Sequence, residues 1–85
     1  MPVISSFYGI IIQMFYFDHN PPHIHAVYGE YRVVISIKDQ VVDGIMPKRA
    51  LNLIFEWMEL HREELLKDWE LAQIGEPLFK IEPLA

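Results

Sequence analysis

The hydrophobic pattern of the chain changes its period once, near residue 46. Before that point the apolar runs are typical of β-strands, and from about residue 47 to 74 apolar side chains recur every three or four positions, as on an amphipathic helix. The segment GEPLFKIEPLA follows as an extended tail. The pattern therefore predicts one α+β domain over residues 1–85, with a β-rich part (1–46), a helical part (47–74) and a tail (75–85). We expect an antiparallel sheet of three or four strands, covered on one face by a C-terminal helix or helix pair.

A two-residue turn at Gly29 and Glu30 constrains the sheet further. Glycine at the first of two central positions suits a type II′ hairpin, in which Tyr28 faces Tyr31 and the pairing continues outward to His23 and Ser36. Side chains alternate across a strand, so the register separates two faces. The predicted core face carries Ile24, Ala26, Tyr28, Tyr31, Val33 and Ile35. The other face, turned away from the core, carries His23, His25, Val27, Arg32, Val34 and Ser36.

Two further β segments flank this hairpin. Residues 7–17 are apolar on both faces apart from Gln13, so we expect one strand covered on two sides or placed at a partner interface. A short strand is expected from Val41 to Ile45, after a turn at residues 38–40.

The helical part is predicted to run from Lys48 to about Ile74, with Pro47 in its first turn and Gly75 as its stop. One apolar stripe follows it: Leu51, Ile54, Met58, Leu65, Trp69 and Ala72. The stripe is widened in the first half only, by Leu53, Trp57 and Leu60. A straight helix of this length would run roughly 40 Å, against roughly 30 Å for a compact domain of this size. We therefore expect a break near Glu59 to Arg62 or a projecting helix that pairs with a second copy, and we favour a bent helix or αα pair in a homodimer.

Composition excludes several classes of function. The chain has no cysteine, which rules out disulfides, zinc knuckles and thiol catalysis and is in keeping with a reducing cytoplasm. The formal net charge is −5, and all of it arises after residue 49. An acidic chain is a poor general ligand for phosphate backbones, so no DNA binding is expected, while the acidic half suits a basic partner. The apolar runs are too short to span a bilayer, and with no basic leader we expect a soluble cytoplasmic protein.

The segment DHNPPHIHAVYGEY holds three of the four histidines. His23 and His25 point the same way from one strand, and His19, beside Asp18, precedes the stiff Pro21–Pro22 pair. The three histidines are candidate ligands of a divalent transition metal such as zinc or nickel, and Asp18 in the preceding loop is a further candidate ligand. Alternatively, His23 and His25 act as general acid and base with no cofactor, while Arg32 stabilises a phosphate and His19 and Ser36 bind the ligand. The third interpretation is purely structural, with a turn followed by half-exposed strand histidines.

The segments MPVISSFYGIII and FDHNPPHIHAVYGEY, with most of the helical part and tail, resemble a bacterial family of small proteins known as domain of unknown function 4160. The most specific part is the pattern His-Asn-Pro-Pro-His-x-His at residues 19–25. The resemblance implies a small bacterial protein encoded beside another short protein, in an arrangement like a toxin–antitoxin pair. It implies no particular activity.

These observations give three functional hypotheses. The first is an interaction component of a two-gene, toxin–antitoxin-like module, whose His23, His25 and Arg32 face contacts RNA or a phosphate-bearing ligand, with metal-independent RNA cleavage if the protein is an enzyme. The second is a non-catalytic module with a transition metal held by His19, His23 and His25. The third is a purely structural partner of another small protein.

Overall fold

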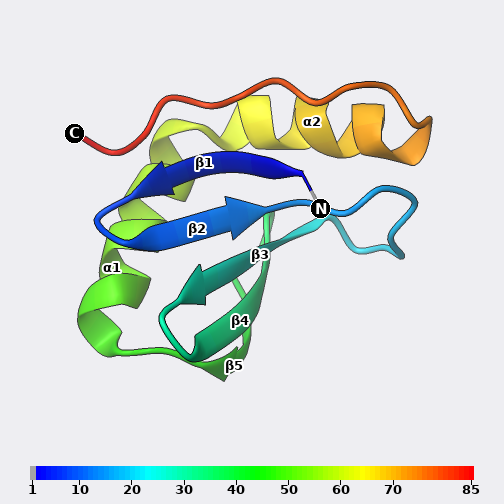
Figure 1. Ribbon diagram of the computed structural model, residues 1–85. Coiled ribbons are helices and arrows are strands. Elements are labelled where there is room, and N and C mark those ends of the chain that lie inside the picture. The colour runs from blue at the N-terminus through cyan, green and yellow to red at the C-terminus, as the bar shows by residue number, and fades with distance from the viewer. Residues whose placement is uncertain (1) are drawn as a thin grey trace.

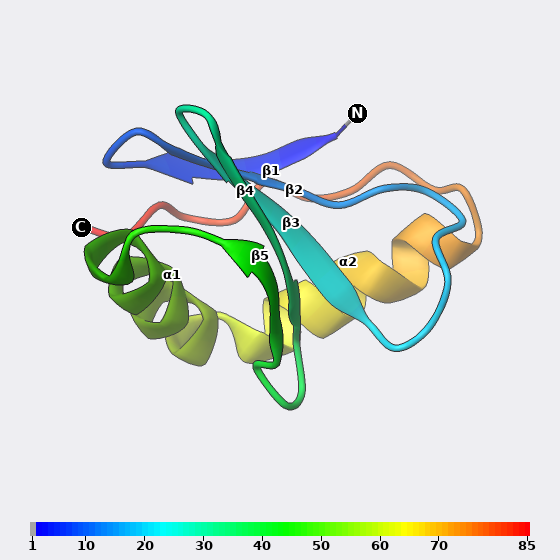
Figure 2. The ribbon, with the colours of Figure 1, turned by 90° about the horizontal axis from the view of Figure 1, so that it is seen from below.

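The computed structural model describes residues 2–85 as a five-stranded antiparallel sheet with two helices on one face. The strands lie side by side in chain order, and Figure 2 shows both helices below the same side of the sheet. The elements are β1 (Val3–Phe7), β2 (Ile10–Gln13), β3 (His23–Tyr28), β4 (Tyr31–Ser36), β5 (Val42–Ile45), α1 (Lys48–Leu60) and α2 (Arg62–Gln73) (Figure 1). The α+β prediction is confirmed, although the sheet has more strands than the three or four expected.

The extra strand arises where a single strand over residues 7–17 was predicted. The chain instead reverses at Tyr8 and Gly9, whose φ angles are 49° and 80°, so β1 and β2 form a hairpin. Two consecutive positive φ angles are the geometry of a type I′ turn. The expectation of a strand covered on both faces is also wrong, because Ile11 of β2 is 38% exposed between the buried Ile10 and Ile12.

The β3–β4 hairpin has the predicted register. Tyr28 pairs with Tyr31 across the turn, and the pairing runs out to His23 opposite Ser36. Gly29 has a φ of +58°, which the first position of a type II′ turn requires. Most of the predicted core face is buried against the helices: Ile24, Ala26, Val33 and Ile35. The tyrosines next to the turn are more than a third exposed.

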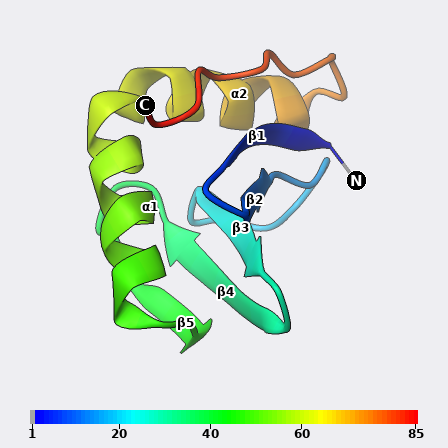
Figure 3. The same ribbon diagram turned by 60° about the vertical axis from the view of Figure 1, so that its left-hand side comes forward.

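The helical part breaks at His61, inside the predicted window, and α1 and α2 run in clearly different directions (Figure 3). The projecting-helix alternative is therefore wrong, and with it the length argument for a homodimer. The molecule extends only 33 Å along its longest axis. Bending lets the stripe on each helix face the same sheet, and it is buried at Ile54, Met58, Leu65, Trp69 and Ala72. Leu60, predicted to widen the stripe, is 66% exposed beside the break.

The C-terminal tail folds back along α2 to the edge of β1. The Ile81 N–H donates to the Ile4 carbonyl at 2.8 Å, and the Trp57 indole N–H donates to the Glu82 carbonyl at 2.7 Å. Ile81 itself is buried. Through Ile81 the tail contributes to the core. Within residues 2–85, no helix has the length and apolar content needed to cross a bilayer.

Candidate functional site

The loop between β2 and β3 is attached to the C-terminal end of α2 (Figure 1). The Phe17 N–H donates to the Ala72 carbonyl at 3.1 Å, and the Gln73 side-chain amide donates to the Asp18 carbonyl at 3.1 Å. The last carbonyls of a helix have no partner within the helix, so they are available to hold a loop. These two hydrogen bonds fix Asp18 over the first residues of β3.

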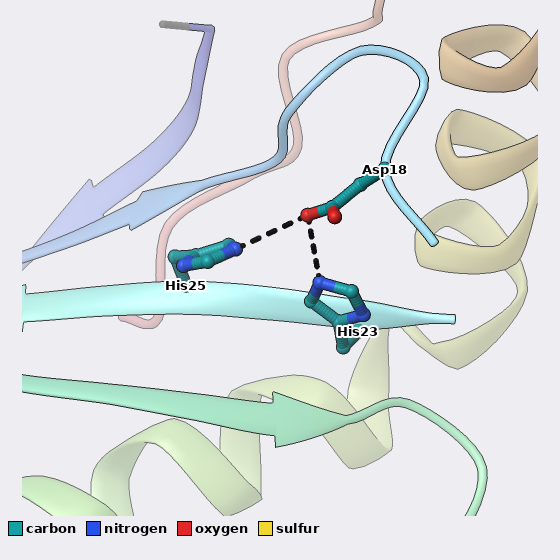
Figure 4. A group of neighbouring side chains, drawn as sticks. All are labelled: Asp18, His23 and His25. Carbon is teal, nitrogen blue, oxygen red and sulfur yellow. Dashed lines mark hydrogen bonds and ion pairs between the residues drawn. The ribbon is translucent and has the colours of Figure 1, made fainter. Parts of the chain in front are cut away.

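The Asp18 carboxylate lies between two histidine rings, as Figure 4 shows. Its Oδ2 atom is 2.8 Å from His23 Nε2 and 3.4 Å from His25 Nε2. Its Oδ1 atom accepts the His19 backbone N–H at 2.9 Å and lies 3.0 Å from His19 Nδ1. One carboxylate therefore gathers all three histidines of the segment.

His23 is enclosed, contrary to the expectation that its ring stands exposed on the open face. The residue is only 5% exposed, because its ring packs 5.0 Å from the Trp69 ring of α2 and lies under the loop. The His23 Nδ1–H donates to the Pro21 carbonyl at 2.7 Å, since a carbonyl oxygen only accepts. Nε2, the other ring nitrogen, is the atom that faces Asp18.

His25 is half-buried on the same side of β3, as predicted, and the Phe15 ring packs against it in a T-shaped arrangement with 4.4 Å between centroids. Burial lowers the pKa of His25, and the nearby Asp18 only partly opposes this effect. Burial also raises the pKa of Asp18, but hydrogen bonds from the His19 backbone and from the rings of His23 and His25 outweigh it, so its pKa is lowered. The surroundings favour a neutral His25 beside an ionised Asp18.

The three side chains open onto a cavity of about 460 Å³. Its lining residues are Asp18, His19, Pro21, His23, His25, Val34, Ser36, Asp39, Val41 and Asp43. The lining includes three carboxylates and neither lysine nor arginine. An acidic cavity of this kind attracts a cation more readily than a polyanion.

The other predicted site residues lie at the margins. The His19 side chain is 84% exposed. Ser36 lines the cavity, but its hydroxyl accepts the Val41 N–H at 2.9 Å. Arg32 lines an adjoining cavity rather than this one. Sequence reasoning named Asp18 only as an additional ligand and missed Phe15, Trp69 and Gln73, although the acid directly before His-Asn-Pro-Pro was a usable signal.

The geometry fits a metal ion. One ligand atom from each of Asp18, His23 and His25 lies within 4.8 Å of the others. With metal–ligand bonds of about 2.0–2.2 Å, neighbouring ligand atoms stand roughly 3.0–3.4 Å apart in octahedral or tetrahedral sites. The separations of 2.8 and 3.4 Å from Asp18 Oδ2 to the two Nε2 atoms are close to this range. Two histidines and one carboxylate form a set that leaves coordination positions open.

A family model described as Domain of unknown function (DUF4160) matches residues 9–70, which is most of the 85-residue chain. The chain belongs to this family, as the histidine segment suggested. The match includes Asp18 and all three histidines of the cluster. No curated protein and no solved structure matches the chain at a significant level.

Proposed function

Because this family has no assigned activity, we propose from the geometry alone that the protein binds a divalent transition metal, such as zinc or nickel, through Asp18, His23 and His25. The observation that supports the proposal best is the 2.8 Å contact between His23 Nε2 and Asp18 Oδ2. His23 uses its Nδ1–H on a backbone carbonyl, so in the neutral ring Nε2 carries a lone pair. Two acceptor atoms at this distance require a proton or a metal ion between them.

The surroundings of the two rings favour the metal ion. Histidines that bind metals usually donate their second ring N–H to a carbonyl or carboxylate, as His23 does to Pro21. Trp69 and Phe15 pack against the two imidazoles and restrict their orientation. A site whose ligands are held in place before binding loses less conformational entropy on binding.

The same geometry is less suited to metal-independent RNA cleavage. In that hypothesis His23 and His25 act as acid and base on a phosphate, with Arg32 beside them. Here both Nε2 atoms converge on one carboxylate oxygen, His23 is enclosed, and Arg32 lies in the next cavity. A general acid and base must each reach the reacting group. We therefore rank metal binding above acid–base catalysis.

Calorimetric titration of zinc into protein stripped with chelator, and purified without a nickel column, tests the proposal. We expect one zinc ion per chain for the wild type and binding about 100-fold weaker for His25→Ala. Asp39→Asn is the matched control and should bind zinc like the wild type, because Asp39 lines the cavity but forms no hydrogen bond or ion pair with either ring. Equal affinity of wild type and His25→Ala, or no binding by the wild type, contradicts the proposal.

The same proteins test the first hypothesis. If stripped wild type cleaves RNA in the presence of chelator and His25→Ala does not, acid–base catalysis replaces metal binding as the function of the cluster. Membership of a two-gene, toxin–antitoxin-like module remains a prediction, and co-expression with the neighbouring gene followed by purification tests it. Retention of that partner by a variant lacking all three clustered histidines would support a structural role.

A further inference from the structure

Arg32 is placed beside the proposed metal site by the register of the sheet. His25 pairs with Val34, and Val27 pairs with Arg32, so Arg32 is a diagonal neighbour of His25 on the same face. Diagonal neighbours of this kind are about 7–8 Å apart, within reach of a long side chain. Both helices lie on the opposite side of the sheet (Figure 2), although His23, at the start of β3, contacts Trp69 of α2.

The cavity that contains Arg32 adjoins the histidine cavity. It measures about 140 Å³ and is lined by Gln13, Phe15, His25, Ala26, Val27, Arg32, Val33, Val34 and Asp43. His25, Val34 and Asp43 line both cavities. Arg32 is exposed, and among residues 2–85 no carboxylate forms an ion pair with its guanidinium. Its donors are therefore free for a ligand in the joined cavity.

We propose that Arg32 and the bound metal together hold a terminal phosphate group, so that the ligand is a phosphate monoester. This inference depends on the proposed metal site. A monoester has three free oxygens, of which one can bind the metal while two accept the planar fork of the guanidinium. A phosphodiester and a carboxylate each have two free oxygens and lose one of these contacts. The arrangement thus favours the end of a phosphorylated molecule over an internal phosphate of RNA.

The charges around the cavity make this binding depend on the metal. Asp18, Asp39 and Asp43 carry three negative charges, against which the protein alone offers Arg32. A divalent cation brings the local charge to zero and supplies the electrophilic contact for the phosphate oxygen. The stripped protein should therefore not bind a phosphate monoester.

Titration of methyl phosphate into zinc-loaded protein tests the inference. We expect saturable binding that is at least roughly tenfold tighter than that of dimethyl phosphate or acetate, because a charged hydrogen-bonded contact is lost with the latter two. Arg32→Gln should weaken methyl phosphate binding at least roughly tenfold and leave the affinity for zinc unchanged. Lys48→Gln, which removes the same charge at the start of α1, is the control and should bind methyl phosphate like the wild type.

The outcomes separate this inference from the proposed function. If the protein does not bind zinc, both fail, and the zinc titration shows it. If zinc binds but methyl phosphate does not, or Arg32→Gln binds it as well as the wild type, only the phosphate site is overturned and the metal site stands. Equal binding of methyl phosphate by stripped protein, or equal affinity for dimethyl phosphate, likewise overturns the phosphate site as described.

Discussion

Asp18 lies in the loop that α2 holds, and Asp68 lies in α2 itself. The two carboxyl groups differ in the hydrogen-bond partners around their oxygens. Asp18 has a partner at each oxygen: the His19 backbone N–H at Oδ1 and the rings of His23 and His25 at Oδ2. Asp68 is only 1% exposed; its Oδ1 accepts the Phe79 N–H at 3.0 Å, and its Oδ2 has no hydrogen-bond partner. The first carboxylate faces nitrogen atoms at both of its oxygens, and the second is mainly desolvated.

The two surroundings shift the pKa values in opposite directions. Burial raises the pKa of Asp68, the Phe79 N–H partly opposes this, and the nearby Glu64 raises it further. The pKa of Asp18 is lowered, because its hydrogen bonds outweigh burial. The comparison teaches that burial alone does not make an acid functional. The nitrogen atoms that converge on its oxygens distinguish Asp18 as the residue of the proposed site.

The largest expected effect concerns metal affinity. Asp18→Asn should lower the affinity for zinc at least about 100-fold, because it removes the only negative ligand of the proposed site. Asp68→Asn makes the same chemical change elsewhere and should leave zinc affinity unchanged. Competition with a chromogenic chelator measures both constants. Similar affinities for the two variants would remove the distinction between these carboxylates.

Alanine substitutions at two glycines with positive φ test how the loop that carries Asp18 is held in place. A Cβ on Gly75, with φ +74°, would lie 3.0 Å from the Phe17 ring in that loop, whereas a Cβ on Gly29, with φ +58°, meets nothing within 4 Å. Both alanine variants incur the cost of an unfavourable backbone conformation, about 1 kcal/mol. Gly75→Ala should lose slightly more stability than Gly29→Ala, because the Phe17 ring has to shift by a few tenths of an ångström.

Urea unfolding and zinc titration of both variants measure these costs. Zinc affinity should fall in Gly75→Ala only, because Phe17 directly precedes Asp18. If Gly29→Ala weakened zinc binding as much as Gly75→Ala, the attachment of the loop to α2 would not be what positions the carboxylate.

Replacing the charged Asp68 should stabilise the fold. Its pKa in the folded state lies above the ordinary value of 3.8, so the folded protein favours the protonated form and loses stability as pH rises through that pKa. Asp68→Asn does not titrate and should raise the free energy of unfolding by about 1 kcal/mol at neutral pH. The gain should disappear below pH 3.8.

Chemical denaturation of Asp68→Asn over a series of pH values measures this dependence. Glu70→Gln, on the exposed side of α2, is the control and should change stability by less than about 0.5 kcal/mol at any pH. A loss of stability in Asp68→Asn at neutral pH would mean that the buried carboxylate is better solvated than its contacts indicate.

The sequence alone predicts the structure correctly where that structure depends on residues close together in the chain. The β3–β4 register follows from Gly29 and the alternation around it, and that register places His23 and His25 on one side of β3. The β1–β2 turn was missed because a tyrosine with positive φ is uncommon, although Gly9 beside it was a usable turn signal. The helix break at His61 could be inferred only from the length of the helical part relative to the domain.

Contacts between distant segments explain what was missed at the site. The burial of His23 depends on Trp69, and the position of Asp18 depends on Gln73, both from α2. Neither contact follows from spacing within the histidine segment. The alternation of a strand predicts which side chains share a face, but not which loop later covers one of them.

The smallest expected effect belongs to the hydrogen bond between Gln73 and the Asp18 carbonyl. Gln73→Met keeps the length of the side chain and removes its donor, so the free energy of unfolding should fall by about 0.5–1.5 kcal/mol. Because the Phe17 bond to Ala72 remains, zinc affinity should fall by less than about tenfold. Denaturation and zinc competition together assess the contact. A loss as large as that of Asp18→Asn would mean that Gln73 alone orients the carboxylate, and no loss in either measurement would assign the positioning of the loop to Phe17.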